Sequence, residues 1–141
     1  MAKENTSLLD MLGIRKDHQV CLTGIYPALN ELLRESCNLT NVLARTQMDQ
    51  LLREGKSFDR VVITASPSNG TNEVEDALVI RAAQLTKAGG LIYLFTPVKA
   101  LGESFGNAVL KYYPSQNVRG FNTPMGPVMV TGAHGNPEEQ K

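Results

Sequence analysis

Residues 57–98 read SFDRVVITASPSNGTNEVEDALVIRAAQLTKAGGLIYLFTPV, and this stretch decides the fold. Its two apolar runs, 60–65 and 91–95, are rich in β-branched and aromatic residues and lack polar alternation. That composition favours strands covered on both faces, as in a parallel sheet. The segment 72–87 between them repeats apolar residues at helical spacing. The stretch is therefore predicted to form a strand, a helix and a parallel strand.

The ends of that helix are predicted from single residues. Asn72 can cap the first turn, with Glu75 three residues on as in a capping box. Gly89 and Gly90 follow the helical pattern, and a glycine supplies the positive φ that ends many helices. We expect the helix to stop there.

Similar patterns place further elements on both sides of this unit. The sequence predicts a helix over 7–13, strands over 19–23 and 41–44, a helix from Pro27, a helix from Thr46 closed by Gly55, a helix over 101–113, and a final antiparallel strand pair over 117–122 and 128–132. The order is that of a doubly wound, mostly parallel α/β sheet, Rossmann-like, with a C-terminal antiparallel pair. Ligands of such sheets bind at the carboxyl ends of the strands, here between strands 19–23 and 60–65.

Composition narrows the class of protein. The 141 residues suit one domain over 1–141, with 1–6 and 134–141 expected to be flexible. Fourteen basic and fourteen acidic residues balance, which disfavours nucleic-acid binding. No apolar stretch approaches 18 residues, so no membrane span is predicted and a cytoplasmic location is expected. Cys21 and Cys37 lack ligand spacing, so we expect reduced thiols and no metal site.

Three features resemble the class I methyltransferases that bind S-adenosylmethionine. They are Phe58-Asp59 before an apolar strand, the run KAGGLIYL at 87–94, and the C-terminal strand pair. The run at 87–94 resembles the turn at a helix end and the fifth strand of that family, and the strand pair resembles its sixth and seventh strands. The resemblance implies a methyltransferase-like fold more strongly than it implies an activity.

The family's cofactor motifs are missing from this sequence. The resemblance would require a glycine-rich turn after the first strand, but Gly24 is followed by the bulky Ile25 and Tyr26. It would also require an acidic residue after the second strand, where Arg45 stands instead. Residues 46–56 form one helix and turn, so the family's third strand is absent and the fold has one strand fewer. We therefore expect no bound cofactor.

A degenerate group of this fold is more similar still: the N-terminal domain of the anamorsin family of cytosolic iron–sulfur assembly proteins. The matching positions are Ser57, Phe58, Asp59, Gly89, Gly90, Pro97 and Val98. The resemblance implies a domain that works through protein partners, among them a diflavin reductase and iron–sulfur assembly factors. The cysteine-rich part that carries clusters in that family has no counterpart in this sequence.

The turn 66–71 is the best candidate for a small-molecule site. If a cofactor or anion binds, Gly24, Ser66, Ser68, Asn69 and Thr71 are the predicted contacts, because hydroxyls and amides there precede a helix. The ordinary alternative is that these side chains only cap the helix and close the turn. Asp59 is a weaker candidate for a general base, since a carboxylate at the start of a strand is usually solvated. No catalytic residue is assigned.

Because nucleic-acid binding, a membrane span, a metal site and a bound cofactor are all disfavoured, contact with other proteins is the function that remains. The predicted contact residues are Tyr26, Ser68, Asn69 and Lys99, in loops at the carboxyl ends of the strands. Tyr26 is the preferred anchor, and Tyr26→Ala is expected to leave the fold intact. Of the neighbouring Tyr112 and Tyr113, we expect one in the core and one exposed. The rival interpretation is an S-adenosylmethionine-dependent methyltransferase or nucleotide-binding enzyme with an atypical site.

Overall fold

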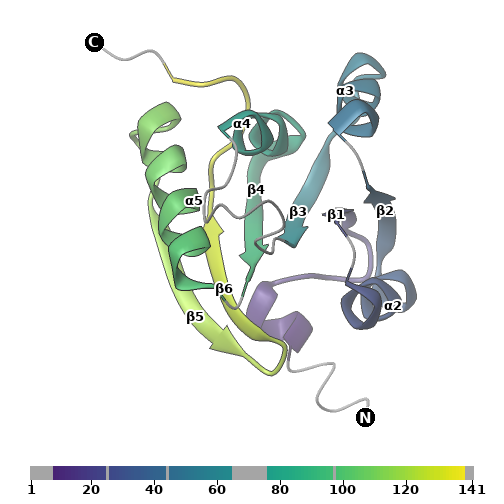
Figure 1. Ribbon diagram of the computed structural model, residues 1–141. Helices are drawn as coiled ribbons and strands as arrows, with labels where there is room; N and C mark the ends of the chain where they lie inside the picture. The colour runs from purple at the N-terminus through teal and green to yellow at the C-terminus, as the bar shows by residue number, and fades with distance from the viewer. Residues whose placement is uncertain (1–7, 25, 44, 65–75, 97, 139–141) are drawn as a thin grey trace.

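The computed structural model describes residues 8–24, 26–43, 45–64, 76–96 and 98–138. These residues form a six-stranded sheet between two layers of helices (Figure 1). The strands are β1 (Gln19–Thr23), β2 (Asn38–Val42), β3 (Phe58–Thr64), β4 (Thr86–Phe95), β5 (Val118–Thr123) and β6 (Gly126–Thr131), in the order β2-β1-β3-β4-β6-β5. The first four in this order run parallel, and β6 is antiparallel to both β4 and β5. The predicted fold class is confirmed.

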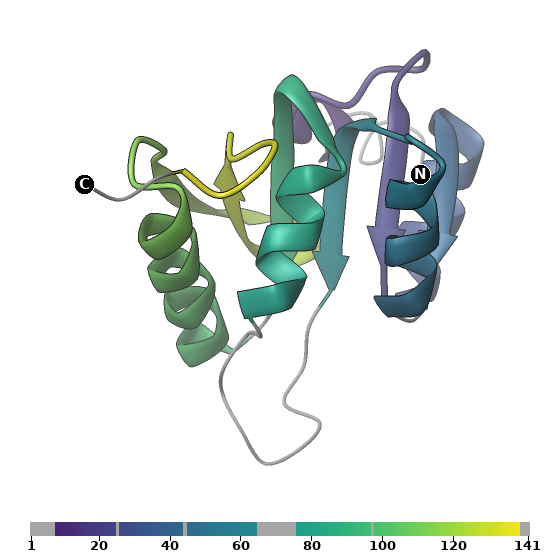
Figure 2. The same cartoon turned by 90° about the horizontal axis from the view of Figure 1, so that it is seen from above.

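Helices cover both faces of the sheet (Figure 2). Helices α3 (Arg45–Arg53), α4 (Asp76–Gln84) and α5 (Lys99–Tyr112) lie on one face, over a core that includes Met48, Val61, Ile63, Ile92 and Phe105. Helix α2 (Pro27–Ser36) and the helical residues 8–12 lie on the other, over a core that includes Leu22, Leu29, Leu33, Val62 and Tyr93. Each inner strand alternates side chains between these two cores, which explains its unbroken apolar sequence.

Strand β2 differs from its prediction in its boundaries. It spans Asn38–Val42 instead of 41–44, because backbone pairing with β1 begins at Asn38 opposite Gln19. The chain passes from β2 through α3 directly into β3, on the far side of β1. Among the described residues, the only element between β2 and β3 is helix α3. The sheet therefore lacks the family's third strand, as the sequence predicted.

The glycine pair at 89–90 does not end a helix, contrary to the prediction. Helix α4 ends at Gln84, and Phe58 N–H donates to Leu85 O at 2.7 Å, which draws the chain into β4 from Thr86 onward. Gly89 (φ +82°) and Gly90 lie in an irregular first part of β4, where the pairing with β3 shifts register. A Cβ on Gly90 would lie 2.7 Å from Asp59 O, so close packing of strands requires this glycine. The predicted helix start at Asn72 and Glu75 lies outside the described residues.

Hydrogen bonds hold the first helix to the sheet and the C-terminal tail to helices α4 and α5. The Tyr93 hydroxyl donates to Leu12 O, and Arg60 Nη2 donates to Gly13 O at 3.0 Å, so two side chains satisfy the end of the first helix. At the other end, the tail expected to be flexible is hydrogen-bonded to the body as far as Glu138. Gly135 N–H donates to Ala83 O at 2.8 Å and Glu138 N–H donates to Tyr112 O at 2.8 Å.

Candidate functional site

The carboxyl ends of β1 and β3 meet at the point where the strand order reverses, as predicted. Gly24 follows β1 with φ +94°, and its N–H donates to Val42 O at 3.0 Å. A Cβ on Gly24 would lie 2.3 Å from Thr64 Oγ1 and 2.9 Å from Thr64 O. The Thr64 hydroxyl donates to Thr23 O at 2.9 Å. The space that Gly24 leaves is therefore taken by β3 of the same chain.

An amide network links the carboxyl ends of β1 and β2 to helix α2. Asn41 Nδ2 donates to Leu22 O at 2.8 Å and to Gly24 O at 3.3 Å. Asn30 Nδ2, from α2, donates to Asn41 Oδ1 at 3.0 Å, and Arg34 Nη2 donates to Asn30 Oδ1 at 3.0 Å. None of these polar side chains was predicted to form a site. The position of Asn41 inside a predicted strand could have indicated such a network, because asparagine is disfavoured in strands unless its amide has a specific partner.

Tyr26 extends across the same edge of the sheet. It lies just before α2, half-buried, and its hydroxyl donates to Met125 O at 3.0 Å in the turn between β5 and β6. Its ring packs edge-on against Phe95 at the end of β4, with centroids 6.3 Å apart. The side chain predicted as an anchor for a partner is thus already engaged within the chain. These contacts lead us to expect a loss of stability when the side chain is removed, whereas the sequence alone predicted an intact fold.

An open pocket lies at the other end of this edge, where β4 leads into α5. It encloses about 380 Å³. Leu94, Thr96 and Val128 are buried and form its base, while Lys99 and Glu103 are exposed among its lining residues. The pocket also includes Val98, Gly102, Pro127 and Met129. The predicted contact residue Lys99 is therefore the first residue of α5, beside a mainly apolar pocket, rather than part of a loop.

Local sequence explains how the pocket is held open. Val98 N–H donates to Thr96 Oγ1 at 3.1 Å, which fixes the turn from β4 into α5. Gly102 faces β6: a Cβ there would lie 3.4 Å from Met129 Cγ. The apolar residues of the pocket can accept an apolar group, and the charged Lys99 and Glu103 can pair with charges beside that group. The predicted site residues Ser66, Ser68, Asn69 and Thr71 lie outside the described residues.

Asp59 lies at the opposite, amino edge of the sheet, far from these strand ends. Its Oδ2 accepts Gln19 N–H at 2.8 Å, and Lys87 Nζ lies 3.8 Å from Oδ1. The Gln19 hydrogen bond, assisted by the positive charge of Lys87, lowers the pKa of the Asp59 carboxyl below its usual value. An ionised carboxylate that holds the start of β1 is a structural group, in line with the ordinary alternative to a general base.

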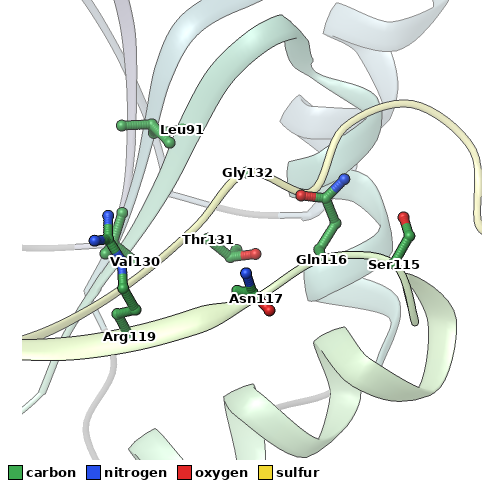
Figure 3. A pocket seen from close by; sticks show the side chains of 8 residues that line it. All are labelled: Leu91, Ser115, Gln116, Asn117, Arg119, Val130, Thr131 and Gly132. Carbon is green, nitrogen blue, oxygen red and sulfur yellow. The ribbon is translucent and has the colours of Figure 1, made fainter.

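The amino edge also carries a polar pocket of about 310 Å³ (Figure 3). Gln116, Asn117 and Arg119 contribute polar groups, and Leu91 and Val130 contribute apolar ones. The neighbouring Ser115 N–H and hydroxyl both donate to Glu138. This pocket offers hydrogen-bond donors but brings no acid–base pair together. It was not predicted, because its residues come from a turn and three strands and form no motif.

The remaining candidates have structural roles. Tyr113 is buried, as predicted for one of the pair, but Tyr112 is half-buried and donates to Asp76 Oδ2 at 2.8 Å. Burial raises the pKa of the Cys21 thiol to about 12 and that of Cys37 to about 11.

Within the described ranges, no three side chains of the kind that hold a metal gather together. The described helices include none long and apolar enough to cross a membrane.

Comparison with known proteins supports the fold. No family model matches the sequence, and no curated protein matches it. Solved structures do match: the 16S rRNA N2-G1207 methyltransferase of T. thermophilus, in complex with AdoMet and guanosine, has 16% identity and a TM-score of 0.65 over 92% of this chain. Phosphoethanolamine N-methyltransferase 2 of Haemonchus contortus has 10% identity and a TM-score of 0.59 over 98% of this chain. This chain spans 41% and 38% of those two proteins.

A shorter neighbour matches along nearly all of both chains. The release factor-specific protein-(glutamine-N5) methyltransferase chain of Alicyclobacillus acidocaldarius has 10% identity and a TM-score of 0.56, with 93% of each chain covered. At such identities the likeness concerns the fold alone. The chain has the fold of the class I S-adenosylmethionine-dependent methyltransferases.

Proposed function

Because the chain has the fold of methyltransferases, we propose that it is a methyltransferase-like domain that acts through protein contacts instead of methyl transfer. The observation that carries this proposal is the contact between Gly24 and Thr64 at the end of β1. In the methyltransferase family the backbone at this turn approaches the cofactor. Here it approaches β3 of its own chain.

Two further features support the absence of cofactor binding. The side chain of Asn41, near the end of β2, is committed to Leu22 O and Gly24 O. The sequence after it, Val42-Leu43-Ala44-Arg45, has no carboxylate to accept the ribose hydroxyls. Tyr26 packs edge-on against Phe95 and its hydroxyl donates to Met125 O, across the edge where the amino-acid end of the cofactor lies in the family. The chain's own side chains thus occupy this edge.

The proposed contact surface is the open pocket beside Lys99. Its apolar base suits a leucine or aromatic side chain of a partner, and Lys99 and Glu103 can pair with charges on either side of it. Ser68 and Asn69, which follow β3 in the sequence, are proposed to belong to the same surface. Tyr26 packs edge-on against Phe95 and is not proposed as the exposed anchor of this surface.

The proposed partners follow from the resemblance to the anamorsin N-terminal domain. They are a diflavin reductase and iron–sulfur assembly factors, and the proposed location is the cytoplasm. Nucleic acid and membranes are not proposed as partners, since the charges of the chain balance.

Titration calorimetry with S-adenosylmethionine and with ATP tests the first half of the proposal. We expect no binding of either at millimolar concentration. A dissociation constant below about 100 μM, or roughly −5.5 kcal/mol, would contradict it and favour the rival enzyme. Thr64→Ser retains the hydroxyl that faces Gly24 and serves as a control for the integrity of the turn.

Affinity capture from cytosol tests the second half. The full chain is expected to recover a diflavin reductase, and Lys99→Glu is expected to lose it. Lys56→Glu makes the same change of charge at an exposed residue just before β3, at the amino edge. If both variants capture the reductase as well as the unmodified chain does, the pocket beside Lys99 is not the contact surface.

A further inference from the structure

Strand β2 forms one edge of the sheet (Figure 1), and hydrogen bonds to β1 fix which way its backbone groups point. Asn38 N–H donates to His18 O at 3.1 Å, and Val42 O accepts Gly24 N–H at 3.0 Å. In a parallel ladder the N–H and C=O of one residue point the same way, and successive residues alternate. Residues 38, 40 and 42 therefore face β1, whereas 39, 41 and 43 face outward.

The outward side of β2 is capped by a side chain at Leu43 and is open before it. Leu43 N–H donates to Gln47 Oε1 at 2.6 Å. Within the described part of the chain, the N–H groups of Leu39 and Asn41 have no acceptor. The strand reads NLTNV, without the charged residue or proline that usually protects an edge from pairing. The opposite edge strand, β5, carries the exposed Arg119.

The side chains of the outward residues lie on the α2 face. Leu39 packs against the core on that side, and the Asn41 amide bonds to Asn30 of α2. The Asn41 side chain is therefore turned inward and leaves the middle of the edge free of bulk. Leu43, on the same face, is 64% exposed.

We propose that β2 pairs antiparallel with β2 of a second copy of this chain, around a two-fold axis at Asn41. The two Asn41 residues then exchange N–H···O=C bonds, and Leu39 of each copy lies opposite Leu43 of the other. The two sheets become one continuous sheet. In each copy, the exposed Leu43 side chain is then covered by Leu39 of the other copy.

A second copy fits this edge better than an unrelated strand does. Two-fold pairing needs a self-complementary patch, and an uncharged strand with leucines two residues either side of Asn41 has that symmetry. The edge also lies away from the pocket beside Lys99, so this inference is independent of the proposed function.

Sedimentation of the full chain across the micromolar range tests the pairing. We expect a concentration-dependent dimer that Leu43→Lys weakens by about tenfold or more, since each copy would bury a charge. Leu110→Lys is the matched control, because Leu110 is 50% exposed on α5 and far from β2 in sequence. A monomer at every concentration overturns the proposal, and so does a dimer that Leu43→Lys leaves intact.

Amide hydrogen exchange locates the contact. Protection of the Leu39 and Asn41 amides is expected to rise with protein concentration in the unmodified chain but not in Leu43→Lys. The Thr40 amide, which faces β1, serves as the internal reference and is expected to stay constant. If the dimer forms while both outward amides exchange at the monomer's rate, another surface joins the copies and the proposal is wrong.

Discussion

The carboxyl edge of the sheet has two unlike halves. In the closed half, Gly24, Thr64, Asn41 and Tyr26 fill the strand ends with contacts of the chain's own making. In the open half, β4, α5 and the start of β6 leave an apolar pocket of about 380 Å³. Doubly wound sheets usually bind ligands where the strand order reverses, which here is the closed half. In this chain the fold is kept while its usual ligand position is filled and a neighbouring one stays open.

The same substitution in the two halves should separate them most strongly. Gly24→Ala places a Cβ 2.3 Å from Thr64 Oγ1 at a positive φ, and we expect a loss of about 3 kcal/mol in the free energy of unfolding. In Gly102→Ala, in the open half, the nearest atom to the new Cβ is Met129 Cγ at 3.4 Å, an ordinary van der Waals contact. The variant also replaces a glycine inside a helix. We expect a change within about 0.5 kcal/mol for that variant. Urea unfolding midpoints measure both, and equal midpoints would remove the distinction between the halves.

Tyr26 tests whether the closed half depends on a side chain that spans the edge. Tyr26→Ala removes the ring contact with Phe95 and the bond to Met125 O, and a half-buried aromatic side chain of this kind is worth about 2 kcal/mol of stability. Tyr26→Phe keeps the ring and should cost about 1 kcal/mol. Thermal unfolding of both variants gives the two terms. If Tyr26→Ala melts like the unmodified chain, Tyr26 is available for a partner, as the sequence alone predicted.

Asn41 tests the polar part of the same seal. Asn41→Ala leaves Leu22 O and Gly24 O without the amide donor, which we expect to cost about 1 kcal/mol. The urea midpoint reports the loss, with Asn117→Ala, at an exposed residue of the amino-edge pocket, as the comparison. A loss in Asn117→Ala as large as that in Asn41→Ala would mean that the network adds nothing specific.

The smallest effect is expected at the amino edge, which serves as a reference for both halves. The folded-state pKa of Asp59 is lowered, so its contribution is present above the ordinary carboxyl pKa and is lost as the pH falls through the folded value. The ordinary value is about 3.9. Asp59→Asn should therefore reduce stability by a few tenths of a kcal/mol at neutral pH, and by less as the pH falls through the folded-state pKa. Stability curves from pH 2 to 7 that run parallel for the two proteins would contradict this.

Local sequence was sufficient for the types of element and their order along the chain, but not for the bounds of β2 or the start of β4. The apolar runs at 60–65 and 91–95, the helical spacing before and after them, and the turn at Pro124 and Met125 each predict structure from neighbours in the chain. Strand β1 was predicted with its observed bounds, Gln19–Thr23. These features follow from the periods of buried residues, which a sequence contains directly.

The tertiary structure alone decided how the strand ends are filled. Gly24 meets Thr64 across 40 positions, and Tyr26 bonds to Met125 across 99. Gly89 and Gly90 predict a helix stop locally, yet pairing with β3 places them inside β4. Contacts between distant residues depend on strand order and register, which periodicity does not specify. That is why the sequence alone determined the framework of this protein, and only its folding showed which half of the carboxyl edge is closed.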